Sequence, residues 1–222
     1  MKRCYIPLAP HPLKERQQEE FNMADTSSRS SSKGLRNLVG TALLTAIVFV
    51  LQVLGSFVRF GPFSISLVLV PIVVGAALYG AYSGLWLGFA FGIAVLVSGD
   101  AAAFLTINPI GTVVTVLLKG ALAGLVSGIV YRALQKKNEL LAAVCAAVVC
   151  PVVNTGVFLL GCRLFFFDTI RQWAEGAGFG ANVGSYMILG LVGANFLVEL
   201  AVNIILSPTI VRLVKFGRKA WT

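Results

Sequence analysis

The stretch LLKGALAGLVSG, Leu117–Gly128, places a lysine and a ladder of glycines inside an apolar run. Gly120, Gly124 and Gly128 follow Lys119 at intervals of four residues. A charge is costly in hydrocarbon, whereas small residues at i and i+4 let membrane helices approach closely. We therefore expect a membrane helix that packs against a neighbour and directs Lys119 into the protein.

The composition is typical of a membrane protein. Of the 222 residues, 57% are hydrophobic and 12% are charged, about half of the charged fraction in a soluble protein. The net charge of +9 comes from basic residues between apolar runs, which indicates membrane topology rather than a nucleic-acid partner. We expect no cofactor or metal, because the four cysteines form no C-x-x-C pair and the one histidine, His11, lies in a polar region.

Apolar segments indicate an all-α integral membrane protein with six transmembrane helices in one bundle. A helix needs roughly 17–25 residues to cross the hydrocarbon core. The segments lie near 37–58, 63–80, 82–98, 111–131, 140–161 and 184–207. They predict a disordered polar tail over residues 1–33, which has little to bury, a membrane domain over residues 34–216, and a short basic tail over residues 217–222.

Lysine and arginine residues set the predicted orientation. With the N-terminus in the cytoplasm, nine basic residues flank the cytoplasmic ends of the segments and three lie in external loops. The nine are Lys33, Arg36, Arg132, Lys136, Lys137, Arg212, Lys215, Arg218 and Lys219, and the three are Arg59, Arg163 and Arg171. This asymmetry satisfies the positive-inside rule, and an even number of spans returns the C-terminus to the cytoplasm.

A second pair of small residues, Ala42 and Ala46, lies in the first segment, within GTALLTAIVFVLQ. Together with the six segments and the glycine-rich fourth segment, it gives residues 35–216 a resemblance to the substrate-binding S component of energy-coupling factor (ECF) transporters. The resemblance implies a multi-pass protein of a bacterial or archaeal cell membrane that captures a vitamin or related micronutrient outside. It also implies delivery inward with a T component, which Ala42 and Ala46 would contact, and two cytoplasmic ATPases. The chain carries no phosphate loop of its own.

Polar residues in and beside the apolar segments are the candidate substrate contacts, because such residues are costly in lipid and are usually paired or functional. Lys119 and Glu199 lie at similar depth, so they could form an ion pair. Alternatively, Lys119 could meet an anionic group on the substrate or extend toward the interface. Amides both donate and accept hydrogen bonds, which suits a heteroaromatic or amide-bearing ligand. The full set is Lys119, Asn154, Asn108, Asp100, Glu199, Asn195, Trp86 and Arg59.

Each of these residues also has a purely structural interpretation. The asparagines could form interhelical hydrogen bonds, and Asp100 could cap a helix or loop. Trp86 could pack in the core or face lipid, and Arg59 could simply be solvated. The sequence leaves these alternatives open.

Two other classes of function compete with substrate binding. An intramembrane protease is disfavoured because no histidine lies in an apolar segment, and Asp100 and Asp168 lie at outer boundaries. We therefore expect no enzyme activity. A stand-alone ion-coupled secondary transporter of a small metabolite is the alternative, with Lys119 and Glu199 as an ion relay. The small size and the absence of an inverted repeat argue against it.

Overall fold

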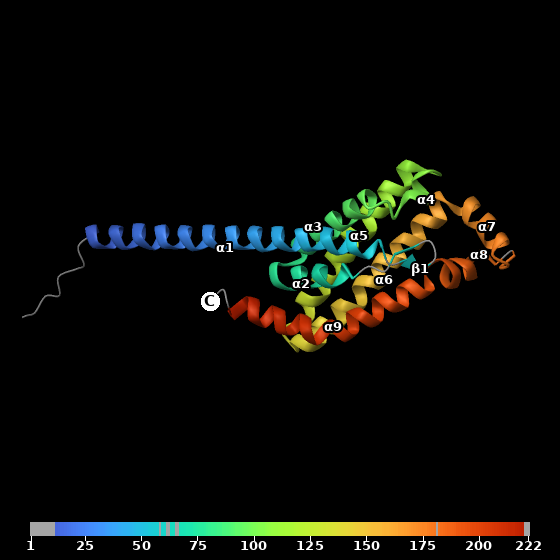
Figure 1. The fold of residues 1–222 in the computed structure, drawn as a ribbon. Helices are drawn as coiled ribbons and strands as arrows, with labels where there is room; N and C mark the ends of the chain where they lie inside the picture. Colours follow the sequence, from blue (N-terminus) through green and yellow to red (C-terminus); the bar gives the residue numbers. More distant parts are fainter. Residues whose placement is uncertain (1–11, 58, 61–62, 65–66, 181, 220–222) are drawn as a thin grey trace, which may run out of the picture. The chain divides into compact units, whose positions relative to one another are not determined.

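The computed structural model describes residues 12–57, 59–60, 63–64, 67–180 and 182–219, with side chains from residue 34 onward except at 59–60, 63–64 and 218–219. Their regular structure is helical apart from two short antiparallel strands, β1 and β2 (Figure 1). The elements are α1 (Pro12–Gly55), β1 (Arg59–Phe60), β2 (Phe63–Ser64), α2 (Leu69–Tyr79), α3 (Ala81–Val97), α4 (Ala102–Leu105), α5 (Pro109–Leu134), α6 (Glu139–Phe165), α7 (Phe167–Gly176), α8 (Val183–Ser185), the π-helix η1 (Tyr186–Gly193) and α9 (Ala194–Lys219).

The chain forms two compact units, Met1–Val39 and Gly40–Thr222. Their boundary falls within α1, whose backbone is helical from Pro12. The disordered tail over residues 1–33 stays a prediction, because residues 1–11 lie outside the described part and the side chains of 12–33 are not described. The fold that follows is that of the unit Gly40–Thr222.

Each predicted apolar segment contains a helix, but the helices differ in length. Four stretches are long and apolar enough to cross a membrane: Gly34–Gly55, Pro109–Leu134, Glu139–Phe165 and Val183–Gly217. The shorter apolar helices are α2 and α3. The second segment was predicted from residue 63, yet its helix begins only at Leu69, after the strand β2. The turn between α2 and α3 lies at Gly80, whose φ of 103° favours glycine.

Glycines join α3 to α5. A Cβ atom built on Gly120 would lie 2.2 Å from the carbonyl oxygen of Gly88, and one on Gly124 would lie 2.0 Å from that of Gly84. Gly128 likewise faces the backbone of Ala81. The predicted close packing of the glycine ladder is confirmed, and α3 supplies matching glycines at the same four-residue spacing.

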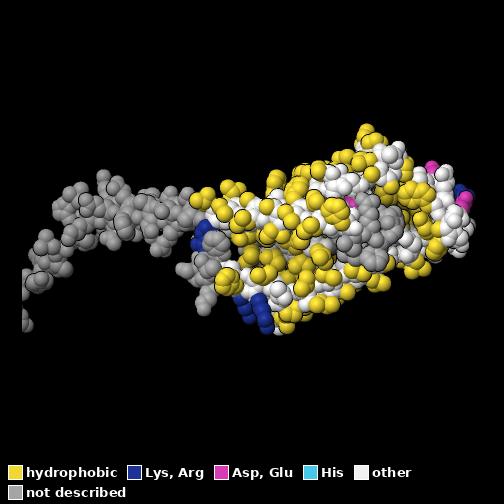
Figure 2. All heavy atoms as spheres, viewed as in Figure 1, with side chains coloured by type: hydrophobic (Ala, Val, Ile, Leu, Met, Phe, Trp, Pro, Cys, Tyr) yellow, Lys and Arg dark blue, Asp and Glu magenta, His cyan; other side chains and the backbone are white. Residues whose placement is uncertain are grey.

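The surface of this unit carries many apolar side chains (Figure 2). Leu160 on α6, Leu189 on η1 and Ile205 on α9 are between 63% and 73% exposed. A large exposed apolar surface is unusual in a soluble monomer, and it fits contact with lipid. The exposed side chains and the apolar composition of the helices therefore both indicate a membrane protein.

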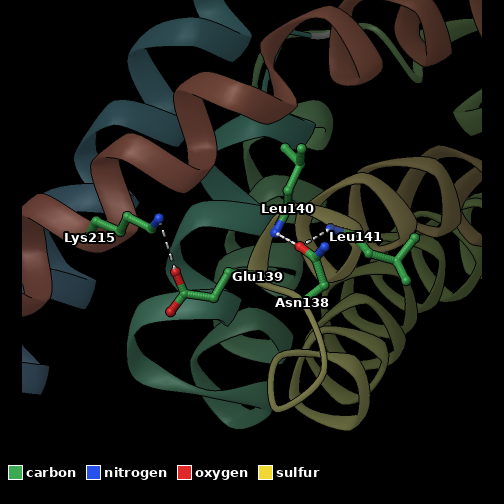
Figure 3. Close-up of polar contacts among 5 residues, drawn as sticks. All are labelled: Asn138, Glu139, Leu140, Leu141 and Lys215. Carbon is green, nitrogen blue, oxygen red and sulfur yellow. Dashed lines mark hydrogen bonds and ion pairs between the residues drawn. The ribbon is translucent and has the colours of Figure 1, made fainter.

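A polar contact joins α6 and α9 at one end of the unit (Figure 3). The Nζ atom of Lys215, late in α9, lies 3.6 Å from the Glu139 carboxylate at the start of α6. The side chain of Asn138 accepts hydrogen bonds from the backbone N–H groups of Leu140 and Leu141, which caps α6. Four basic residues lie toward the same end of the unit. Arg132 is in the last turn of α5, Lys136 and Lys137 follow α5, and Arg212 is on α9.

We expect Gly124→Ala to destabilise the protein, because the new methyl group would meet the Gly84 carbonyl. Overpacking of this kind costs about 1–3 kcal/mol, so the melting temperature in detergent should fall. Gly156→Ala on α6 is the matched control, since no heavy atom lies within 4 Å of its added Cβ. Equal melting temperatures for the two variants would show that the close approach of α3 and α5 is not needed.

Candidate functional site

A cavity lies inside the bundle, toward the end where α1 and α3 finish and α5 begins. This end is opposite to the Lys215–Glu139 contact, because α5 and α6 run between the two. The lining residues are Gln52, Phe91, Val95, Asp100, Ala101, Phe104, Thr112, Thr115, Val116, Lys119, Asn154, Phe158, Phe166, Asn195 and Glu199. The wall thus combines an ammonium group, two carboxylates, amides, hydroxyls and aromatic rings.

Amide groups hold both carboxylates of the wall. Gln52, only 1% exposed, donates through Nε2 to the carboxylate of Asp100 and, at 3.4 Å, to the hydroxyl of Ser98. These bonds attach α1 to the end of α3. On α9, the Nδ2 atom of Asn195 donates to Glu199 Oε1 at 3.2 Å. Each carboxylate is therefore oriented by a neutral donor.

Lys119 lies among aromatic rings. Its Nζ atom is 5.6 Å from the ring centroid of Phe91 and 5.3 Å from that of Phe158, within the range of cation–π attraction. Phe158 packs edge-on against Phe104, which also packs edge-on against Phe166. The ion pairs formed by the described side chains do not include Lys119.

Five of the eight candidate residues meet in this cavity: Lys119, Asn154, Asp100, Glu199 and Asn195. They come from α5, α6, the turn after α3, and α9. Depth in the apolar segments was the property that selected most of them. The structure shows that their side chains also share one side of the bundle interior.

Two of the other three candidates, Asn108 and Trp86, are not among the described residues of the cavity wall. Asn108 accepts a hydrogen bond from the backbone of Gly111 at 2.9 Å, so it caps α5 ahead of Pro109. Trp86 is 51% exposed and donates to the Thr45 hydroxyl at 3.3 Å. Arg59 has its backbone in β1, and its side chain lies outside the described residues. Asn108 therefore caps a helix and Trp86 lies largely at the surface, and a role of either residue in substrate binding stays a prediction.

Sequence reasoning missed several wall residues, among them Gln52, Thr115, Phe91, Phe104 and Phe158. Gln52 had a usable signal, because it is an amide within an apolar segment. The phenylalanines had none, since aromatic residues in membrane helices read as ordinary packing. A threonine in such a helix is equally inconspicuous.

Ala42 and Ala46 both lie on the exposed side of α1. Their predicted role in partner contact stays a prediction, and their exposure is compatible with it.

Comparisons with known proteins agree with this architecture. A model of the family described as ECF transporter, substrate-specific component, matches residues 36–211. Among solved structures, ThiT from Listeria monocytogenes has a similar fold, with a TM-score of 0.58 and 22% sequence identity, over 82% of this chain and 98% of the ThiT chain. At this identity the likeness concerns the fold alone. No curated protein sequence matches.

We expect Lys119→Met to leave the melting temperature of the substrate-free protein unchanged or higher. The substitution removes a charge that lies beside the aromatic rings of Phe91 and Phe158, and a methionine sulfur packs well against such rings. Differential scanning fluorimetry in detergent measures the change. A clear fall in melting temperature that Glu199→Gln restores in the double variant would instead indicate a structural Lys119–Glu199 ion pair.

Proposed function

The chain belongs to the family of ECF transporter substrate-specific components, and on that premise we propose that it captures a vitamin-like micronutrient in the cavity and delivers it inward. A protein of this family is a membrane subunit that binds a transport substrate, and it is not an enzyme. Delivery would follow an ATP-driven cycle with a T component and two ATPases.

The main support for this binding site is the presence of a polar cavity inside an apolar helical bundle. Asn154 is 5% exposed, and its Oδ1 atom makes no hydrogen bond with the described residues. Lys119 lies in the same wall. Burying such groups is costly unless they find partners. A substrate with polar atoms at its edges would supply partners, while the rings of Phe104 and Phe158 would cover its apolar parts.

We propose six spans with both termini in the cytoplasm. The helix α2, with 11 residues, is shorter than a usual span, and α3, with 17 residues, is at the lower limit. Both are largely buried by their neighbours, so these neighbours would replace much of the lipid around them. Arg132, Lys136 and Lys137 at the α5–α6 turn, together with Lys215, would face the cytoplasm. The cavity would then lie toward the outside, where a substrate is captured.

The direct test is to purify the protein in mild detergent and identify the small molecule that leaves it on denaturation, by mass spectrometry. A retained micronutrient that rebinds to the emptied protein supports the proposal. If neither the purified protein nor protein incubated with a cell extract retains any compound, substrate capture by this cavity is wrong.

We expect Lys119→Met to weaken binding of the retained compound at least ten-fold. A charge-assisted hydrogen bond contributes roughly 1.5–3 kcal/mol, and about 1.4 kcal/mol corresponds to a factor of ten in affinity. Titration of the emptied protein with the compound measures the dissociation constant. Lys137→Met, far from the cavity, is the control and should bind like the wild type. If Lys119→Met binds the compound with wild-type affinity, Lys119 has a structural role and does not bind the substrate.

We expect Ala42→Trp and Ala46→Trp to prevent assembly with the T component while leaving substrate affinity unchanged. A bulky ring would separate helices that need close contact at these positions. Co-purification with the T component and ATPases measures assembly, and Leu160→Trp, exposed on α6, is the control. Substrate uptake by this chain without any partner would favour the ion-coupled alternative.

The orientation predicts that the α5–α6 turn is cytoplasmic. A single cysteine placed by Lys137→Cys, in a variant without native cysteines, should resist a membrane-impermeant thiol reagent in intact cells. The same cysteine should react after the membrane is permeabilised. Labelling in intact cells would reverse the proposed topology.

A further inference from the structure

Three buried oxygen atoms of the cavity wall make no hydrogen bond with the described residues: Thr115 Oγ1, Asn154 Oδ1 and Asn195 Oδ1. They come from α5, α6 and α9, and all three side chains line the same cavity. Buried polar atoms in proteins almost always have a partner. Three such atoms around one cavity therefore indicate that the partner is something that enters it.

Thr115 departs from the usual behaviour of a helical threonine, whose hydroxyl can bond to the carbonyl four residues earlier. Thr45 makes this bond to Thr41, and Thr112 makes it to Asn108, both at 2.8 Å. Thr115, which is only 4% exposed, does not make it within the described structure. Gly161 on α6 leaves room for its side chain, since a Cβ there would lie 2.4 Å from the Thr115 oxygen.

The amide of Asn195 is already oriented by its surroundings. Its Nδ2 atom donates to the Glu199 carboxylate at 3.2 Å, which leaves Oδ1 as the atom available to a ligand. Asn154 also has its Oδ1 atom buried and available. The two asparagines thus present acceptors, and the Thr115 hydroxyl can accept as well.

We propose that Thr115, Asn154 and Asn195 bind one edge of the substrate through its N–H or O–H groups. This inference rests on the proposed function. The carboxylates of Asp100 and Glu199 lie in the same wall. Their negative charge favours hydrogen-bond donors on this edge of the substrate and disfavours an anionic group. Lys119 is left to meet an electron-rich or anionic group of the same molecule. The substrate therefore carries at least two hydrogen-bond donors, and it is not a simple carboxylate or phosphate without them.

Thr115→Val tests the assignment, because valine keeps the shape and removes only the hydroxyl. The probe is the small-molecule fraction that methanol releases from purified wild-type protein, returned to protein emptied of bound compound. Thr155→Val is the matched control on α6, outside the cavity wall. We expect Thr115→Val to bind the retained compound about five- to ten-fold more weakly, as for the loss of one hydrogen bond, and Thr155→Val to bind it like the wild type.

Two further measurements separate a ligand-binding role from a structural one. Without the probe, Thr115→Val should melt at the wild-type temperature or above, because it deletes a buried polar atom that has no partner. The released compound should show at least two exchangeable hydrogens by mass spectrometry in D₂O.

Undiminished binding by Thr115→Val, a lower melting temperature of the probe-free variant, or a compound with fewer than two exchangeable hydrogens would overturn the inference while leaving the proposed function intact. Retention of no compound by the wild-type protein would overturn both.

Discussion

The backbone contact between α3 and α5 is the constraint on which the cavity depends. In lipid, helices gain little from the hydrophobic effect, so their association relies on close packing and on polar contacts. Gly84 and Gly88 on α3 meet Gly124 and Gly120 on α5 at distances that exclude any side chain. This contact sets both the separation of the two helices and the rotation of α5 about its own axis.

The rotation of α5 determines which of its residues can meet a substrate. Neighbouring residues on an α-helix differ by about 100° in direction. Gly120 faces α3, whereas Lys119 and Thr115, one turn apart, face the cavity. One helix thus carries a packing surface and a binding surface side by side, and a change in the first would redirect the second.

The opposite wall is formed where the helical geometry itself changes. The π-helix η1 ends at Gly193, two residues before Asn195 and six residues before Glu199. Segments of π-helix often occur at functional sites, since they rotate the residues that follow relative to a regular α-helix. Here the residues that follow include the amide–carboxylate pair of the wall. The apolar periodicity of this region does not distinguish a π-helix from an α-helix.

By itself, the sequence determined the membrane class, the location of the helices and the close packing of the Gly120–Gly128 ladder, because these follow from local composition and spacing. The family membership also agrees with the resemblance drawn from those features. Only the tertiary structure decided which polar residues share a cavity. Depth along a helix can be read from the sequence, but the direction of a side chain depends on the neighbour against which its helix packs. Gln52 and Asp100, 48 residues apart, meet in the wall for that reason, whereas Trp86 lies at the surface.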